Sequence, residues 1–375
     1  MIPRFYRDLG SFLAPNKVLV IYGPRQAGKT TLLNDFLSRT KFKYKLDSGD
    51  NIRTQQVLSS QDFTKILDYT SGYELLALDE AQRIPNIGQG LKIIVDQTPN
   101  IRVIATGSSS FELSGQIGEP LTGRKKTLTL FPVAQLELAK IHNFHELKEK
   151  LPDWMIFGSY PAVVTAKTKK EKTAILEELV DSYLLKDILE LDRIKASRVI
   201  LDLLRLLAFQ IGNEVSLSEL GAKLGIDYKT VGRYLDLLEK SFVVFNLRGF
   251  SRNLRKEVTR KSKYYFCDNG IRNAVISNFN DLELRDDSGK LWENFLVIER
   301  LKTQAYLGIP SNNYFWRTWD QKKIDWLEER EGRIFGFEFK FSSTKNRVPK
   351  EFLAAYPEAQ IEVINPENYP GFLGI

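Results

Sequence analysis

The chain has 375 residues, of which 43% are hydrophobic and 27% charged, and its formal net charge is +7 at pH 7. This composition is typical of a folded protein with two or three domains, and it excludes a low-complexity or intrinsically disordered chain. No apolar run approaches the roughly 20 residues of a membrane-spanning helix, and the first residues lack the apolar core of a signal peptide. We therefore expect a cytoplasmic protein with no membrane partner.

The small numbers of cysteine and histidine residues limit the kinds of metal site that the chain can form. Cys267 is the single cysteine, which excludes disulfide bonds within the chain and zinc sites made of several cysteines. The chain also has only two histidines. We therefore expect any metal to have oxygen ligands. The positive net charge is compatible with a polyanionic partner such as nucleic acid but does not by itself identify one.

Residues 17–31 combine a predicted strand, a glycine-rich loop and the start of a helix. Residues 18–21 are continuously apolar, as in a parallel-sheet strand covered on both faces, and the next residues read G-x-x-x-x-G-K-T. In such a loop the glycines turn backbone N–H groups towards phosphates, the lysine reaches the outer phosphates and the threonine ligates Mg²⁺. The residues expected to hold ATP are Gly23, Pro24, Arg25, Gln26, Ala27, Gly28, Lys29, Thr30 and Thr31. A chance glycine turn is the alternative, and the flanking strand and helix argue against it.

A second motif supplies the acids that ATP hydrolysis needs. The apolar run 75–78 predicts a strand that ends at Asp79 and Glu80. Asp79 is expected to hold the magnesium ion together with Thr30, and Glu80 to orient and deprotonate the attacking water. A strand that ends in two acids is common by itself but rare after a phosphate loop.

Two further candidates for this site have open alternatives. The predicted strand 102–108 ends in hydroxyl residues, and Thr106, Ser108 or Ser109 is expected to sense the γ-phosphate, with Ser108 our choice. Arg124 is a candidate arginine finger because a guanidinium binds two phosphate oxygens at once, either in its own subunit or in a neighbouring one. The alternative is that Arg124 belongs to an exposed basic loop.

The middle of the chain predicts helices and then a possible DNA-binding element. Apolar residues recur at helical spacing through residues 151–207, which indicates a helical lid or connector. Residues 216–240 read as two short helices separated by Gly225, a helix-turn-helix, and a strand follows at 242–247. On the second helix Lys229, Thr230 and Arg233 are expected to face DNA, although Asp236 and Glu239 on the same helix would repel it.

Residues 248–263 are rich in lysine and arginine and indicate DNA binding more strongly than the helix-turn-helix does. Arg252, Arg255 and Lys256 are expected to contact DNA phosphates from the wing that follows the helix-turn-helix. A solvated hairpin is the alternative, and such folds also serve as protein-docking modules.

The last third predicts a helix around residues 292–301 and strands at 313–319, 323–327 and 333–341. Two of these strands carry acids within apolar runs, and strand alternation places Glu338 and Lys340 on the same face. Asp325 and Glu338 are the acids expected to hold Mg²⁺ beside a phosphodiester, while Lys340 stabilises the developing charge. An acid and a lysine two residues apart also occur often without such a role.

Four stretches together carry a family resemblance: GPRQAGKTTLL, LLALDEAQRIP, ATGSSSFEL and LTGRKKTLTLFPVAQLEL. In this order they resemble a prokaryotic AAA-type ATPase family related to the signal-transducing NTPases, most of whose members are uncharacterised. The resemblance implies that the ATPase is followed by a winged helix and a restriction-endonuclease-like domain of the PD-(D/E)xK type. It also implies that Glu293 is an additional metal ligand.

The combined expectation is an α/β protein with four domains. These are a phosphate-loop AAA-type ATPase with a parallel sheet and helices on both faces (1–140), a helical lid (141–207), a winged helix-turn-helix (208–262) and a nuclease-like α/β domain (263–375). The expected function is ATP hydrolysis with Mg²⁺ coupled to DNA binding, in DNA processing or defence. Mg²⁺-dependent DNA cleavage and homo-oligomerisation through the ATPase are left open. The alternative is an ATP-driven regulatory switch whose last two domains only dock partners.

Overall fold

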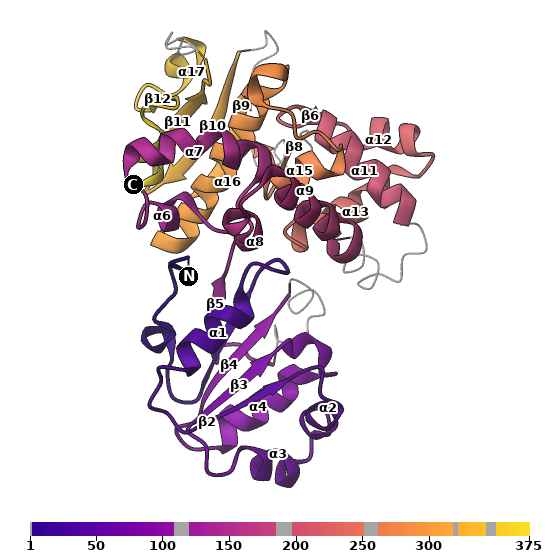
Figure 1. The fold of residues 1–375 in the computed structure, drawn as a ribbon, viewed down its shortest axis with the longest axis vertical. Helices are drawn as coiled ribbons and strands as arrows, with labels where there is room; N and C mark the ends of the chain where they lie inside the picture. Colours follow the sequence, from indigo (N-terminus) through magenta and orange to yellow (C-terminus); the bar gives the residue numbers. More distant parts are fainter. Residues whose placement is uncertain (1, 109–119, 185–196, 251–261, 318–321, 343–349) are drawn as a thin grey trace. The chain divides into compact units, whose positions relative to one another are not determined.

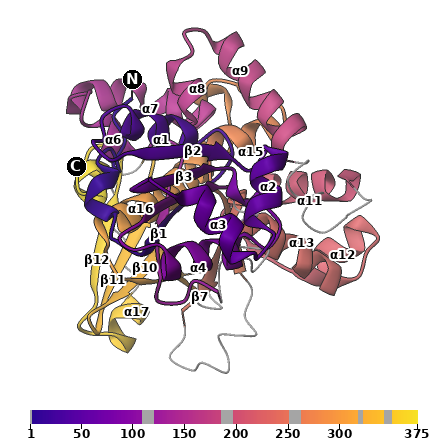
Figure 2. The same cartoon turned by 90° about the horizontal axis from the view of Figure 1, so that it is seen from below.

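The computed structural model describes residues 2–108, 120–184, 197–250, 262–317, 322–342 and 350–375. The chain folds into two compact units (Figures 1 and 2). The first contains Met1–Pro132 with Lys240–Phe242, and the second contains Val133–Glu239 with Val243–Ile375. Within the described ranges, no helix is both long enough and apolar enough to cross a membrane.

The first unit is built on a five-stranded parallel sheet in the order β2-β3-β4-β1-β5. Its strands are β1 (Lys17–Tyr22), β2 (Tyr44–Ser48), β3 (Leu75–Asp79), β4 (Arg102–Gly107) and β5 (Lys125–Thr129). The helices are α1 (Lys29–Leu37), α2 (Ile52–Leu58), α3 (Phe63–Thr70) and α4 (Ile87–Gln97), with short 3₁₀ turns η1 (Leu9–Phe12) and η2 (Ala81–Arg83).

The central strand β1 is buried on both faces, as its apolar run predicts. Val18 and Val20 belong to a core cluster that includes Leu91 of α4, and Leu19 on the other face is equally buried. Because α1 lies against β4 and also buries its apolar side chains, both faces of the sheet are covered. The expected α/β architecture with a parallel sheet and helices is confirmed for this unit.

The second unit begins with helices, as the helical spacing predicts. They are α6 (Gln135–Leu138), α7 (Phe144–Phe157), α8 (Pro161–Thr165), α9 (Lys169–Glu178), a π-helical turn η3 (Leu179–Leu184) and α11 (Ser197–Phe209). Next come β6 (Glu214–Val215), α12 (Leu217–Leu224), α13 (Tyr228–Lys240), β7 (Val244–Gly249) and β8 (Ser262–Phe266). The rest comprises α15 (Asn269–Val275), η4 (Leu282–Leu284), α16 (Ser288–Leu307), β9 (Asn312–Arg317), β10 (Lys323–Arg330), β11 (Arg333–Phe339), α17 (Lys350–Ala355), β12 (Gln360–Ile364) and α18 (Tyr369–Leu373).

Local signals in the sequence account for the pair α12 and α13. The Ser216 side chain caps α12 by accepting the Glu219 N–H, and Gly225 ends that helix in the left-handed region at φ +67°. Asp227 then accepts the Lys229 N–H at 2.7 Å and starts α13. Val231 and Leu235 of α13 are buried, as expected of a helix with one apolar face.

The described strands of the second unit form one seven-stranded sheet, in the order β12-β11-β10-β9-β7-β8-β6. The hairpin β7–β8 pairs with β6 through β8 and runs parallel to β9 through β7. The expected boundaries at 207/208 and 262/263 therefore fall inside a single unit, and the second lies within β8. Sequence patterns show strands but not their partners, which is why this continuity was not predicted.

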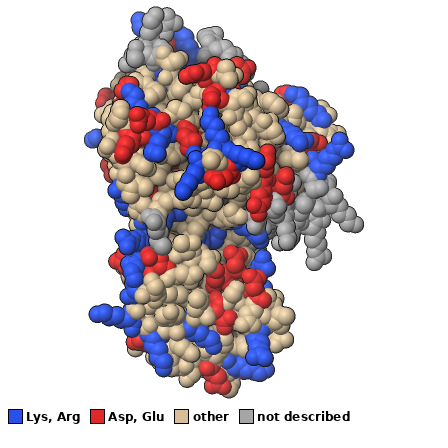
Figure 3. Space-filling model, in the orientation of Figure 1, with Lys and Arg blue, Asp and Glu red and all other residues tan. Residues whose placement is uncertain are grey.

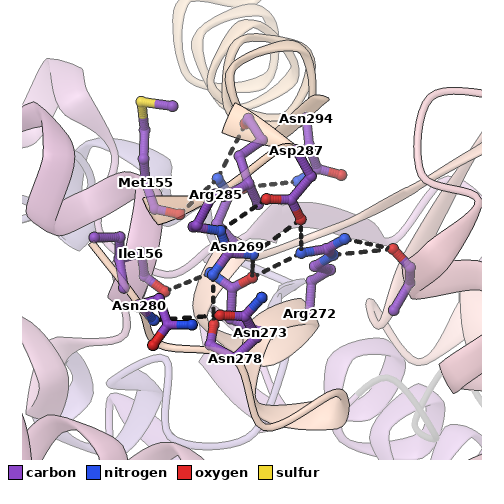
Figure 4. Close-up of polar contacts among 12 residues, drawn as sticks. Met155, Ile156, Asn269, Arg272, Asn273, Asn278, Asn280, Arg285, Asp287 and Asn294 are labelled. Carbon is purple, nitrogen blue, oxygen red and sulfur yellow. Dashed lines mark hydrogen bonds and ion pairs between the residues drawn. The ribbon is translucent and has the colours of Figure 1, made fainter. Parts of the chain in front are cut away.

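A buried polar network joins the helices of this unit (Figure 4). The Arg272 guanidinium on α15 donates to the Ala208 carbonyl at 3.0 and 2.7 Å, and to the Asp287 carboxylate at 2.5 Å. Arg285 also donates to Asp287, at 2.7 Å. Burial alone would raise the pKa of Asp287, but these two guanidinium groups hold it below its usual value. The network fixes α15 against the end of α11 and the start of α16.

Gly158, directly after α7, occupies a backbone conformation that requires glycine. Its φ and ψ are +71° and −157°, and a Cβ there would lie 1.9 Å from Oδ1 of the buried Asp268. The adjacent Ser159 N–H donates to the same carboxylate at 2.7 Å. The loop and the carboxylate therefore pack with no space for a side chain.

We predict that Gly158→Ala destabilises the second unit by about 2–4 kcal/mol, because it adds backbone strain and a collision with Asp268. Thermal or urea unfolding of the full chain would measure the change. Gly308→Ala is the matched control: its φ is also positive, at +64°, but no described heavy atom lies within 4 Å of the added Cβ. We expect a loss of about 1–2 kcal/mol there, from strain alone. Equal losses for the two variants would contradict the packing argument.

Candidate functional site

The phosphate loop of the first unit has the geometry that its sequence predicts. It follows β1 and ends at α1, with Gly23 and Gly28 at φ values of +151° and +96°. A Cβ at Gly23 would lie 2.1 Å from the Leu130 carbonyl oxygen, so only glycine fits. The Lys29 ammonium lies within the loop and donates to the carbonyls of Gly23 and Pro24, each at 2.9 Å. The start of the loop is therefore held against the Lys29 ammonium.

Asp79 joins three elements at the carboxyl end of the sheet. Its Oδ2 accepts the Thr30 hydroxyl at 2.8 Å, and its Oδ1 accepts the Thr106 hydroxyl. These residues come from α1, β3 and β4, so the fold brings the two predicted motifs into direct contact. A carboxylate next to a hydroxyl provides the oxygen ligands that Mg²⁺ prefers, so Thr30 and Asp79 fit the predicted metal role.

Glu80 is held in a strained conformation beside this pair. Its φ of +50° is rare for a non-glycine residue, and such strain clusters at functional sites. The Glu80 N–H donates to the Thr106 hydroxyl at 3.3 Å, and its carboxylate accepts from the Gln82 amide at 2.5 Å. Glu80 is thus fixed at the strand end that carries Asp79.

Among the hydrogen bonds of the described residues, those of the Thr106 hydroxyl reach this centre directly, and Thr106 is one of the three candidates that sequence left open. Thr106 is fully buried and bridges Asp79 and Glu80. Ser108 is also buried, at 3% exposure, and follows the end of β4. Ser109 lies outside the described residues.

Arg124 does not lie at the phosphate loop of its own chain, which corrects one of the two possibilities that we considered. Arg124 immediately precedes β5, and the parallel register pairs Val18 with Lys125 at the start of both strands. The phosphate loop follows the opposite ends of these strands. The Arg124 side chain instead forms an ion pair with Asp96 at 2.5 Å. Arg124 remains a candidate arginine finger only towards the ATP site of a neighbouring subunit.

Arg4 is a contact of the phosphate loop that sequence reasoning missed. Its guanidinium donates to the Ala27 carbonyl inside the loop at 2.6 Å and to the Phe131 carbonyl at 2.5 Å. The partners are backbone oxygens distant in sequence, so no side-chain motif reveals the contact. Arg4 therefore fixes the shape of the loop from outside.

The second unit brings together the acids and the lysine predicted for a nuclease centre, but with additional lysines. Register places Asp325 opposite Glu338, one step beyond the pair Trp326–Phe337, and Lys340 pairs with Glu338 at 2.6 Å. Lys323 lies 2.7 Å from Asp325 and 3.8 Å from Glu293, and Lys263 lies 3.1 Å from Glu293. Among the described residues, no group of three acid, histidine or cysteine side chains is arranged to hold a metal.

The expected DNA-contacting residues are only partly described. On α13, Lys229 and Arg233 are exposed and Thr230 is half-buried, which agrees with outward positions. Arg252, Arg255 and Lys256 lie outside the described residues.

The comparisons with known proteins find three family matches along the chain. Residues 15–139 match the family model described as an AAA domain, while residues 148–282 and 288–369 match two domains of unknown function, DUF8612 and DUF4143. The uncharacterised protein Rv2008c of Mycobacterium tuberculosis is 28% identical over 94% of this chain and 77% of its own length. The uncharacterised ATP-binding protein PH0541 of Pyrococcus horikoshii is 42% identical, over 18% of this chain and 20% of its own length.

A solved structure, the Walker-type ATPase PABY2304 of Pyrococcus abyssi, aligns with 69% of this chain and 91% of its own, at 17% identity and a TM-score of 0.44. The AAA domain match and the loop geometry together support an ATP-binding, ATPase-like function for the first unit. The two other matched domains carry no function in their descriptions.

We predict that Arg4→Ala weakens ATP binding about tenfold, because the Ala27 carbonyl loses a charged donor and the loop loses its external support. Titration with a fluorescent ATP analogue would measure the dissociation constant. Arg7→Ala, at an exposed arginine of the same segment, serves as the control and should bind like the original chain. Equal affinities for all three chains would show that Arg4 does not shape the site.

Proposed function

We propose that the first unit hydrolyses ATP with Mg²⁺ and that the nucleotide state controls the second unit. The observation that carries the proposal is the contact of Asp79 with both Thr30 and Thr106, which assembles both ATPase motifs beside the phosphate loop. Lys29 and the N–H groups at the start of α1 would bind the phosphates. Bound Mg²⁺, held by Thr30 and Asp79, would neutralise phosphate charge.

In this proposal Glu80 acts on water and not on the nucleotide. Its carboxylate lies directly after Asp79, so it is positioned to orient and deprotonate a water that attacks the γ-phosphate. Gln82 holds that carboxylate at one oxygen and leaves the other for water. Binding and hydrolysis therefore depend on different side chains, which makes them separable by mutation.

We predict that Glu80→Gln lowers the ATPase turnover number about 10²- to 10⁴-fold while ATP binding is retained, since only the base is lost. Lys29→Ala should instead abolish tight binding, since it removes the cation inside the loop. A phosphate-release assay and a binding titration on both variants would separate the two effects. Full turnover by Glu80→Gln would exclude Glu80 as the base.

A second proposal is that α13 contacts DNA. The order helix α11, strand β6, helices α12 and α13, and hairpin β7–β8 is consistent with a winged helix-turn-helix. Lys229 and Arg233 are exposed one turn apart on α13. Lysine and arginine side chains are interspersed with acids over the face in Figure 3 and form no broad basic surface there. We therefore infer a contact through α13.

We predict that the double variant Lys229→Ala/Arg233→Ala reduces the slope of log affinity for duplex DNA against log salt by about 1.8, or about 0.9 per lost phosphate contact. Fluorescence anisotropy across a salt series would measure the slope. Lys223→Ala removes a lysine of α12 that pairs with Glu219, and it should leave the slope unchanged. If neither variant changes the slope, the docking-switch alternative gains support.

A further inference from the structure

Each carboxylate expected at the nuclease-like centre already has a partner within the protein. Asp325 Oδ2 accepts the Phe339 N–H at 3.1 Å, and its Oδ1 lies 2.7 Å from the Lys323 ammonium. Glu293 Oε1 accepts both the Tyr265 hydroxyl at 2.7 Å and the Lys263 ammonium at 3.1 Å. Oxygens used in this way are not available to a metal without rearrangement.

Among the described residues, the charges of the cluster also balance. Its three carboxylates, Glu293, Asp325 and Glu338, are matched by three lysines, Lys263, Lys323 and Lys340. Divalent cations bind carboxylate sites largely through uncompensated negative charge. A site whose formal charge is zero therefore attracts Mg²⁺ far less than one with two or three free carboxylates.

Lys323 is the central member of this cluster. It lies at the start of β10, reaches Asp325 on its own strand and is 3.8 Å from Glu293 on α16. Its side chain is 43% exposed, whereas the Asp325 side chain is 1% exposed. Asp325 Oδ1 and Glu338 Oε2 are buried and have no hydrogen-bond partner among the described residues, and each belongs to a carboxylate that is ion-paired with a lysine.

We infer that Lys323 is a built-in cation at the place where the nuclease resemblance requires a metal. The carboxylate cluster is then a neutral, structural part of the second unit that takes up no Mg²⁺. Because it lacks the metal, the nuclease-like part of the second unit binds partners without cutting phosphodiesters. This inference is independent of the ATP site.

Removing only the ammonium would test the inference. Lys323→Met keeps most of the side-chain volume but leaves Glu293 and Asp325 undercompensated, so it should create a divalent-cation site. Lys322→Met is the control, because it removes the neighbouring exposed lysine that pairs with Glu351. Calorimetric titration of nucleotide-free full-length protein with Mn²⁺ would report the number of bound ions.

We expect one additional Mn²⁺ in Lys323→Met, lost again in Lys323→Met/Asp325→Asn, and none in Lys322→Met. The original chain and Asp325→Asn should bind the same number of ions. If the original chain binds an ion that Asp325→Asn loses, the inference is overturned, and this comparison holds even where Lys323→Met fails to fold. Folded Lys323→Met that gains no ion also overturns it. Because no nucleotide is present, neither result bears on the proposed ATPase.

Discussion

The hydrogen bonds of Asp79 to Thr30 and Thr106 are the interaction on which the first unit depends. They connect the end of β3 to the start of α1 and to β4, although β3 and β1 are not neighbours in the sheet. In a parallel sheet the carboxyl ends of all strands meet at one edge, so a loop after one strand can be completed by acids after another. Glu80 acquires its fixed position from the same arrangement.

The phosphate loop could be predicted from sequence because its signals are local. The apolar run before Gly23, the two glycines and the lysine specify strand, loop and helix within fifteen residues, 17–31. The contact between Thr30 and Asp79 also follows once both are placed after parallel strands. Arg4 could not be predicted, because backbone carbonyls that accept its hydrogen bonds leave no trace in residue types.

The errors and gaps come from strand direction and pairing. Arg124 belongs to a sequence motif of the ATPase, but it precedes β5, and β5 runs parallel to β1. Arg124 therefore lies at the edge of the sheet opposite the phosphate loop. Likewise, Lys323 precedes Asp325 by two residues in an ordinary polar stretch of the sequence. Only the folded structure shows that Lys323 forms ion pairs with both Asp325 of β10 and Glu293 of α16. Charge balance in a cluster is a tertiary property, and motif spacing alone does not show it.

The central claim is that the phosphate loop with Lys29 and the Asp79–Thr30 pair form one Mg-ATP site. A crystal structure with Mg²⁺ and a non-hydrolysable ATP analogue tests this claim most directly. The account predicts that Lys29 leaves the carbonyls of Gly23 and Pro24 for the outer phosphates, while Thr30 leaves Asp79 to ligate the ion. A nucleotide bound elsewhere, with those hydrogen bonds intact, would contradict it.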